Sequence, residues 1–268
     1  MKWIILISSL VASAPGWSAV EQFVRYQQGE DTRYGKLVDD HVHPITGDIF
    51  AQFSLDENKV ALDTLELLLP VTPEKVFAVG MNFASHMSSP SDRPPPLFLK
   101  LPSSLILSGQ TVKVPSDARN VHFEGELVIV IGKEARNIPE DQVADVVFGV
   151  TVGNDLTERS WQGQDLQWMR AKATDGFGPI AATITRGVDY ENVLLTTRLN
   201  GKVVQQENTR HMIHSVDKVV SYLSHYFTLK PGDLIFMGTP GRTKALSDGD
   251  VVSVTIDEVG SVENAIQF

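Results

Sequence analysis

The sequence predicts a strand-rich α+β protein in which a small N-terminal β unit precedes a larger domain. Short runs of β-prone apolar residues recur along most of the 268 residues, and glycine or proline turns separate them. Only two segments space their apolar residues with the period of a helix. The sequence contains no internal repeat and no low-complexity tract. These features indicate that β-sheets form most of the core.

The first residues, MKWIILISSLVASAPGWSA, have the layout of a secretory signal peptide. Lys2 precedes an apolar stretch of about ten residues, and small residues typical of a cleavage site follow it. This stretch is too short to span a bilayer, and no other apolar run is long enough to do so. We expect processing between Ala14 and Ala19, with export to the periplasm or the medium. The alternative is that this segment is an apolar first strand of the fold.

Length, charge and cysteine content narrow the possible classes of protein. Removal of residues 1–19 would leave about 249 residues, which suits one large domain or one with a small companion. The formal net charge is −10 and becomes −11 without Lys2, so the surface would repel nucleic acid and anionic lipid. The chain has no cysteine, which excludes disulfides and thiol redox chemistry.

Residues 20–72 form the predicted N-terminal β unit. Val20 to Gly47 alternates short β-prone runs with turn residues, a pattern typical of antiparallel strands. Lys59 to Leu69 adds further β-prone residues, and Pro73 marks a boundary. We therefore assign residues 73–268 to the main domain.

The main domain begins with a predicted strand from Lys75 to Val79, which ends at a glycine. Met87 to Pro96 reads MSSPSDRPPP, a polar, proline-rich loop that is either a mobile lid or an ordinary surface loop. Two further strands are predicted near the C-terminus, at Leu234 to Met237 and at Val251 to Ile256.

Two helices are predicted, and both are structural rather than catalytic. Pro139 to Val146 has acidic residues in its first turn and valines at helical spacing. Ser215 to Phe227 begins with a possible serine cap and places several valines and a leucine on one stripe.

Between residues 121 and 179, three carboxylates in a β-rich setting predict a divalent-metal site. Glu124 and Glu126 are two apart in VHFEGELVIVIG, so in a strand they share a face and lie about 6.6 Å apart along the backbone. Asp155 follows a second β-rich run and could supply a third oxygen if the two strands meet. Carboxylate oxygens are the ligands that hard cations prefer. Arg159 and Lys172 place positive charge beside this site.

The predicted ligand set leaves room for a substrate that also binds the ion. Three carboxylates on a dication leave one net negative charge, and three single-oxygen ligands leave about half of an octahedral shell open. A substrate with two neighbouring oxygens would fit there.

From about Lys75 to Phe268 the chain resembles the fumarylacetoacetate hydrolase family, metal-dependent enzymes that act on 2-oxo acids and β-dicarbonyl compounds. The N-terminal unit resembles the short β domain that precedes the catalytic domain in many members. The segments that carry the resemblance are, in order, VGMNFASH, LFLKLPSS, VHFEGELVIVIGK, GVTVGNDLTERSWQ, RAKATDGFGP, LNGKVVQQENTRHMI, LSHYFTLKPGDLIFMGTPG and SDGDVVSVTIDEVGSVEN.

This resemblance implies a mixed β-sandwich roll, a Mg²⁺ or Mn²⁺ ion and a homodimer that acts on a small 2-oxo or β-dicarbonyl acid. Its metal ligands fall on Glu124, Glu126 and Asp155. Its catalytic groups fall on a lid histidine, His86, and on Lys172, which would stabilise a carboxylate or a developing enolate. The remaining substrate-side positions are Arg159, Gln162 and Thr239.

Structural alternatives accompany the candidates near the site. A Glu-x-Glu pair on a strand is often a solvated face, and most lysines, like Lys172, are exposed. Arg159 could instead pair with Glu158 or Asp165, and Thr239 lies in what is first a tight turn.

Other candidates are interpreted mainly as structural groups. Asn82 and Lys100 match family positions but are taken as scaffold. His41 and His43 form an H-x-H pair that we expect on a surface strand rather than at a metal. His122 directly precedes the ligand strand and is a candidate supporting group.

The sequence departs from the family at the lid. Hydrolytic and decarboxylating members commonly pair the lid histidine with a glutamate three residues later, whereas His86 is followed by Met-Ser-Ser. Asp92 could substitute after loop closure. The leading hypothesis is a carbon–carbon bond hydrolase or lyase that works through a metal-stabilised enolate. The alternatives are a 2-oxo acid hydratase, isomerase or decarboxylase, and an exported binding protein that has lost catalysis.

Overall fold

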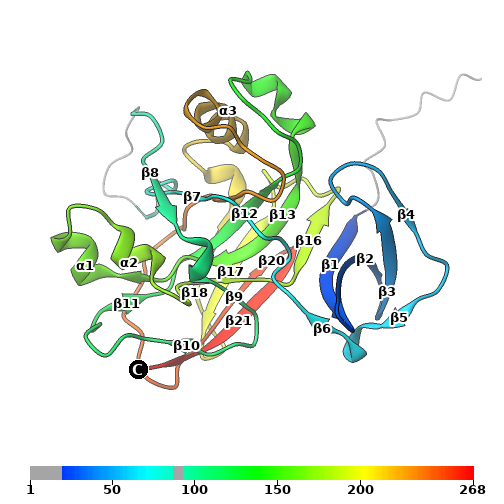
Figure 1. Ribbon diagram of the computed structural model, residues 1–268. Coiled ribbons are helices and arrows are strands. Elements are labelled where there is room, and N and C mark those ends of the chain that lie inside the picture. The colour runs from blue at the N-terminus through cyan, green and yellow to red at the C-terminus, as the bar shows by residue number, and fades with distance from the viewer. Residues whose placement is uncertain (1–19, 87–92) are drawn as a thin grey trace, which may run out of the picture.

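The computed structural model describes residues 20–86 and 93–268 (Figure 1). The predicted signal peptide, residues 1–19, and residues 87–92 of the proline-rich loop lie outside the described residues. Within the described part of the chain, no helix combines the length and the apolar character needed to cross a bilayer.

An antiparallel unit forms the N-terminal part of the fold, as the alternating β-prone runs predict. β1 pairs with β2 and β6, and β3 pairs with β2, β4 and β5. β1 also pairs with β16 of the main domain, so this unit extends the main sheet at one side of the molecule (Figure 1). The strands are β1 Glu21–Gln28, β2 Asp31–Val38, β3 His41–Gly47, β4 Phe53–Leu55, β5 Val60–Ala61 and β6 Glu66–Leu67.

The main domain contains the remaining strands, and its sheets mix parallel and antiparallel pairs. β7 runs parallel to β19, whereas β12 is antiparallel to both β13 and β19. The strands are β7 Val76–Val79, β8 Leu97–Lys100, β9 Leu105–Leu107, β10 Val112–Lys113, β11 Val121–His122, β12 Gly125–Ile131, β13 Val147–Asn154, β14 Thr157–Glu158, β15 Gly178–Ile180, β16 Thr183–Arg186, β17 Leu194–Leu199, β18 Lys202–Asn208, β19 Leu234–Phe236, β20 Val251–Ile256 and β21 Gly260–Gln267.

Two large sheets pack face to face and enclose the main core. One follows the order β4-β3-β2-β1-β16-β13-β12-β19-β7-β8, and the other follows β10-β21-β20-β17-β18. Leu127 and Ile129 of β12 pack in one buried cluster with Leu195 of β17 and Val254 of β20. This arrangement confirms the predicted strand-rich α+β fold with mixed sheets and a small N-terminal β unit.

The helix that was predicted near the C-terminus is confirmed. α3, Val216–Tyr226, begins after Ser215, whose hydroxyl accepts a hydrogen bond from the Lys218 amide at 3.2 Å. Its buried stripe includes Val219 and Leu223, which pack in the main core. A serine at this position caps an amide that has no partner within the helix.

The other predicted helix is a short 3₁₀ helix, Glu140–Asp145. Its apolar residues recur at a spacing of three, which suits the tighter helix as well as an α-helix. Three more 3₁₀ turns occur in the described residues, at Leu62–Thr64, Pro102–Ser104 and Thr209–His211.

Two further short helices were not predicted, although they carry three candidate site residues. α1, Arg159–Gln164, and α2, Met169–Ala173, are too short for apolar periodicity to reveal them. The Glu158 carboxylate caps α1 by accepting from the Trp161 amide at 2.6 Å. These helices lie together at one end of the molecule (Figure 1).

Candidate metal centre

The pairing of β12 with β13 brings three carboxylates from distant parts of the sequence together. Glu126 pairs with Gly153, and the Asp155 amide donates to the Glu124 carbonyl at 2.8 Å. One oxygen each of Glu124, Glu126 and Asp155 lies within 4.8 Å of the others. The predicted ligand set can therefore converge on one ion.

All three carboxylates are buried, so the alternative of a solvated strand face is wrong. The exposed fractions are 4% for Glu124, 2% for Glu126 and 0% for Asp155. Burial, together with the charges of Asp155 and Glu124, raises the pKa of Glu126 well above its usual range. A concentration of buried negative charge is stable only beside cations, since water does not solvate it.

The glycine between the two glutamates allows the sheets to pack closely at this point. A Cβ on Gly125 would lie 2.2 Å from Thr197 Oγ1 and 2.9 Å from a methyl group of Val254. Thr197 and Val254 belong to β17 and β20 of the opposite sheet. Gly125 therefore faces the core while the two glutamates that flank it face the pocket.

Lys172 lies between two of the carboxylates. Its ammonium donates to Glu124 Oε2 and to Asp155 Oδ2, the second at 2.5 Å. Only 3% of Lys172 is exposed, so the alternative of a surface lysine is wrong. Burial acts to lower the pKa of Lys172, but the neighbouring carboxylates outweigh it and raise that pKa.

Lys100 is a second buried cation at the centre, and the sequence did not single it out as a site residue. Its Nζ lies 2.7 Å from Asp155 Oδ1 and also donates to the carbonyls of Lys172 and Phe177. Burial is the main reason that the pKa of Lys100 is lowered. Lys100 holds Asp155 from the side of β8, whereas Lys172 approaches from α2.

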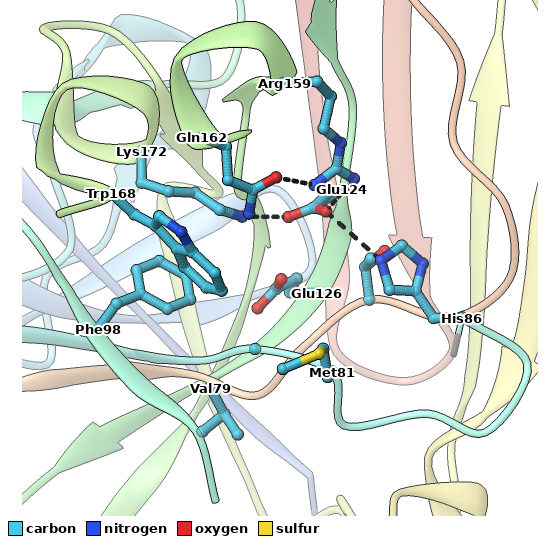
Figure 2. A pocket seen from close by; sticks show the side chains of 12 residues that line it. Val79, Met81, His86, Phe98, Glu124, Glu126, Arg159, Gln162, Trp168 and Lys172 are labelled. Atoms are coloured by element: carbon cyan, nitrogen blue, oxygen red, sulfur yellow. Dashed lines mark hydrogen bonds and ion pairs between the residues drawn. The ribbon is translucent and has the colours of Figure 1, made fainter. Parts of the chain in front are cut away.

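Arg159 points toward Glu124. The alternative, in which Arg159 pairs with Glu158 or Asp165, is wrong. Its Nη2 lies 2.5 Å from Glu124 Oε1, and its Nη1 donates to Gln162 Oε1 at 2.8 Å (Figure 2). Asp165 instead pairs with Arg170, and Glu158 caps α1. Burial acts to raise the pKa of Glu124, but the charges of Lys172 and Arg159 outweigh it and lower that pKa to about 2.

His122 belongs to the hydrogen-bond network behind Arg159. Its Nδ1 lies 2.9 Å from Thr243 Oγ1, which also accepts from Arg159 Nη2 at 3.1 Å. Its Nε2 lies 2.9 Å from Asn120 Oδ1. His122 therefore supports the loop that bonds to Arg159 and does not line the pocket.

His86 reaches the pocket with its orientation set by a backbone carbonyl. Its Nδ1 lies 2.6 Å from the Gly241 carbonyl oxygen, and its Nε2 lies 3.8 Å from Glu124 Oε1 (Figure 2). Since a carbonyl only accepts, Nδ1 carries the proton and Nε2 of neutral His86 is free to act as a base. The Gly241 amide donates to Ser85 Oγ at 3.0 Å, which joins the two loops. Asp92, the predicted substitute partner, lies outside the described residues.

Thr239 lies in the turn after β19, next to the carboxylate of Glu126. The Gly238 amide donates to Glu126 Oε2 at 2.7 Å, and Gln205 donates to Thr239 Oγ1 at 3.0 Å. Gly238 has φ +92°, and a Cβ there would approach Asn82 Cβ to 2.7 Å. Glycine is required at this position because the turn combines a left-handed backbone with close packing.

Asn82 belongs to the scaffold, as predicted, and His41 and His43 lie on a strand, also as predicted. The Asn82 side chain donates to the carbonyls of His214 and Met237 and accepts from the His214 amide, so it ties segments of the scaffold together. His41 and His43 lie on β3 of the N-terminal unit, where His41 Nδ1 contacts Asp40 at 2.6 Å.

These groups line a pocket of about 380 Å³, a volume typical of a site for a small ligand. His86, Glu124, Glu126, Arg159, Gln162, Lys172 and Thr239 all contribute to the lining. Asp155 lies behind them, fully buried. Sequence reasoning missed the apolar part of the lining, which includes Met81, Phe98 and Trp168 (Figure 2). Aromatic residues in a strand-rich sequence are usually core residues, so no signal separated these from the rest.

The donor set fits a hard divalent cation. Three carboxylates converge, and within the described part of the chain Glu126 accepts a hydrogen bond from the Gly238 amide and forms no ion pair. Burial and the charges of Asp155 and Glu124 raise its pKa. An ion of charge +2 that binds Glu126 together with Glu124 and Asp155 would compensate these charges.

The fold and the site define a class: strand-rich α+β proteins with a buried three-carboxylate centre below a small polar pocket. The model of the fumarylacetoacetate hydrolase C-terminal domain matches residues 75–267, and that of an Rv2993c-like N-terminal domain matches residues 22–70. The chain belongs to the fumarylacetoacetate hydrolase family.

Several similar proteins are named as enzymes. A mitochondrial oxaloacetate tautomerase of Xenopus laevis is 35% identical over 234 residues, which cover 81% of this chain and 73% of that protein. A homoprotocatechuate catabolism bifunctional isomerase/decarboxylase of Escherichia coli is 40% identical over 220 residues, 79% of this chain and 51% of that protein. The crystal structure of 5-carboxymethyl-2-hydroxymuconate delta-isomerase from Mycobacterium smegmatis has a TM-score of 0.86 and 34% identity, covering 92% of this chain and 99% of that one. These names support an enzymatic role at the level of the family.

Proposed function

We propose that this chain is a divalent-metal-dependent isomerase or decarboxylase of small 2-oxo acids. It would move a proton at the carbon beside the ketone, or break the bond from that carbon to a carboxylate. The setting of His86 carries the proton-transfer part of this proposal, and the isomerase/decarboxylase among the relatives supports the decarboxylation. Nδ1 is held by the Gly241 carbonyl, which leaves Nε2 as a proton acceptor that faces the pocket.

Glu124, Glu126 and Asp155 would hold Mg²⁺ or Mn²⁺, since their oxygens converge and both ions prefer oxygen ligands. When bound, the ion would polarise the 2-oxo group as a Lewis acid, which stabilises the charge of the transition state by roughly several kcal/mol. The chain supplies the other requirements of the reaction.

Lys172 and Arg159 are placed to bind a substrate oxygen on which negative charge develops. Both line the pocket, and both already donate to Glu124. Charge-assisted hydrogen bonds from buried donors stabilise such an oxygen more strongly than water does. His86 would then accept the proton from the neighbouring carbon and return it.

We place hydrolysis second because a backbone carbonyl, and not a carboxylate, accepts the hydrogen bond from His86 Nδ1. An imidazole that takes a proton from water or from carbon becomes an imidazolium, and a carboxylate partner at Nδ1 stabilises that charge. A backbone carbonyl orients the ring but carries no net charge. Removing a proton from a carbon that the ketone already acidifies demands less of the base. The isomerase and decarboxylase names among the relatives support the same order.

Proton exchange in D₂O tests the proposal. The protein is mixed with Mg²⁺ and an acylpyruvate, and NMR follows the loss of the proton signal beside the ketone. We expect faster exchange than in buffer, and EDTA should abolish the difference. His86→Ala should slow exchange about 10²–10⁴-fold, a usual value for general-base catalysis, and should preserve metal affinity. Equal exchange rates in parent and variant would remove His86 from the mechanism.

His225→Ala is the matched control, because His225 is exposed on α3 and does not line the pocket. Two other outcomes identify the remaining hypotheses. Cleavage of the acylpyruvate to two acids would identify a carbon–carbon bond hydrolase or lyase. Tight binding of metal and oxalate without exchange or cleavage would identify a binding protein.

A further inference from the structure

The pocket has two unlike walls. Arg159, Gln162 and Lys172 form a polar wall above the glutamates, and these residues come from α1 and α2 (Figure 2). On another side the described lining consists of Val79, Gly80, Met81, Phe98 and Trp168, none of which is charged. We call these five residues the apolar wall.

Aromatic packing gives the apolar wall a defined shape. The rings of Phe98 and Trp168 meet edge to face, with centroids 5.5 Å apart and planes at 66°. A Cβ on Gly80 would lie 3.3 Å from Trp168 Cζ3, so the indole packs closely over the backbone of Gly80. Lys172 Nζ lies 4.8 Å from the centre of the Phe98 ring. The wall therefore begins directly beside the polar groups.

Met81 is held in the pocket lining by a backbone conformation that is unfavourable for its residue type. Its φ is +54°, in the left-handed region where residues with a Cβ are uncommon. Its side chain stays 45% exposed although it is apolar, and it points into the pocket near Glu126 (Figure 2). Strained backbone persists where the surrounding structure requires it, and such positions cluster at ligand sites. A thioether there adapts to apolar groups of different shapes.

We propose that the substrate has an uncharged, apolar tail, and that Met81, Phe98 and Trp168 select this tail over a second carboxylate. The inference deepens the proposed function and rests on it, because the polar wall and the metal centre are assigned to the 2-oxo acid head. The tail is the part of the substrate beyond the reacting carbon.

Desolvation and the net charge of the chain both favour an apolar tail over a tail carboxylate. A tail carboxylate against the apolar wall would lose water without gaining a partner there, whereas a methylene gains from the same transfer. The net charge of the chain, −10, adds a general repulsion of dianions. Specificity arises here from both the attraction of one tail and the rejection of the other.

A binding series with matched head groups tests the proposal. Calorimetry with the Mn²⁺-loaded protein compares 2-oxobutanoate, 2-oxopentanoate and 2-oxohexanoate, which share one head group, and oxalate reports separately on the metal and head-group site. We expect affinity to rise about fourfold for each methylene until the pocket is full. 2-Oxopentanedioate should bind at least about tenfold more weakly than 2-oxopentanoate, which has the same number of carbons.

Met81→Lys should reverse the preference, because it places an ammonium on the apolar wall. We expect the ratio of the two five-carbon affinities to fall by at least about tenfold toward the dicarboxylate. Val203→Lys is the matched control, since Val203 is 52% exposed on β18 and does not line this pocket. The control should leave the ratio unchanged. Oxalate binding reports whether each variant keeps its folded site.

The outcomes separate this inference from the proposed function. If the Mn²⁺-loaded parent does not bind oxalate, the assignment of the metal and head-group site fails. If oxalate binds but affinity does not rise with tail length, or the dicarboxylate is preferred, the apolar-tail inference alone is overturned. If Met81→Lys loses oxalate binding, that variant has lost its folded site. The affinity series on the parent protein then tests the apolar-tail inference.

Discussion

Glu126 is the carboxylate of the centre with the least compensation. Burial and the charges of Asp155 and Glu124 raise its pKa, while the Gly238 amide provides its hydrogen bond. Glu124 differs because Lys172 and Arg159 contact it directly. The pKa values of the two carboxylates that flank Gly125 are thus shifted in opposite directions, because Glu124 contacts two cations and Glu126 contacts a backbone amide.

We expect Mn²⁺ binding to release a proton from Glu126. Below its raised pKa, Glu126 is protonated and must lose that proton to bind the ion, so affinity should increase as the pH rises through that pKa. Calorimetry in two buffers of different ionisation enthalpy measures the released proton. Glu126→Gln, which cannot ionise, should bind more weakly and without the buffer dependence. Heats that do not depend on the buffer in the parent would contradict this.

Replacing Lys100 should lower the stability of the fold, although Lys100 does not line the pocket. It is 1% exposed and bonds to Asp155, so Lys100→Met would leave a buried carboxylate with one cation fewer. We expect a loss of about 3–5 kcal/mol in the free energy of unfolding, measured by urea denaturation. Lys113→Met, at an exposed position of β10, is the control and should change it by less than about 0.5 kcal/mol.

At the scale of elements, the junction of β12 with β17 and β20 positions the carboxylates. The sheets approach closely at Gly125, and Glu124 and Glu126 flank it directly. α1 and α2 then add the cationic residues from the other side of the pocket. The site therefore lies between a rigid strand pair and two short helices.

Gly125→Ala should disturb the metal centre although alanine is neither large nor charged. The added Cβ would lie 2.2 Å from Thr197 Oγ1, so the sheets must separate or β12 must shift. We expect a loss of about 1–3 kcal/mol in stability and at least about tenfold weaker Mn²⁺ binding, measured by denaturation and calorimetry. Gly163→Ala is the control, because no atom lies within 4 Å of its added Cβ and alanine favours the helix. Full Mn²⁺ affinity in Gly125→Ala would show that the packing there does not position the ligands.

At the scale of the whole molecule, the homodimer remains a prediction, and one surface suits it. β8 is the last strand of its sheet, and a groove of about 540 Å³ beside it is lined by exposed apolar side chains that include Leu99, Leu166 and Met169. An edge strand with an apolar border is a template for pairing with a second copy.

We expect the parent chain to be a dimer in solution and Leu166→Glu to shift it toward monomer. Leu166 is 96% exposed, so the substitution should not change the fold of one chain. Analytical ultracentrifugation at several protein concentrations measures the shift. Leu55→Glu, at an exposed position of the N-terminal unit, is the control. A monomeric parent would contradict the prediction, and so would a Leu166→Glu variant that dimerises as tightly as the parent.

Export also remains a prediction, since residues 1–19 lie outside the described part of the chain. The N-terminal sequence of the protein recovered from cells would report whether processing occurs between Ala14 and Ala19.

Alternating patterns and motif spacing predicted the strand-rich fold, the capped helix α3 and the carboxylates that converge. These features depend on the period of side chains along a strand or helix and on the preference of Mg²⁺ and Mn²⁺ for oxygen, both of which can be read along one stretch of chain. α1 and α2 could not be predicted in this way, because five or six residues do not complete enough turns to show a period.

The sequence by itself indicated which residues could bind a metal and which segments could form strands. Only the tertiary structure decided that Lys100 holds Asp155, that Gly241 orients His86, and that Phe98 and Trp168 meet at the pocket. Those contacts join residues far apart in the chain. Their distances are set by how sheets and loops pack, and no local pattern in the sequence encodes that packing.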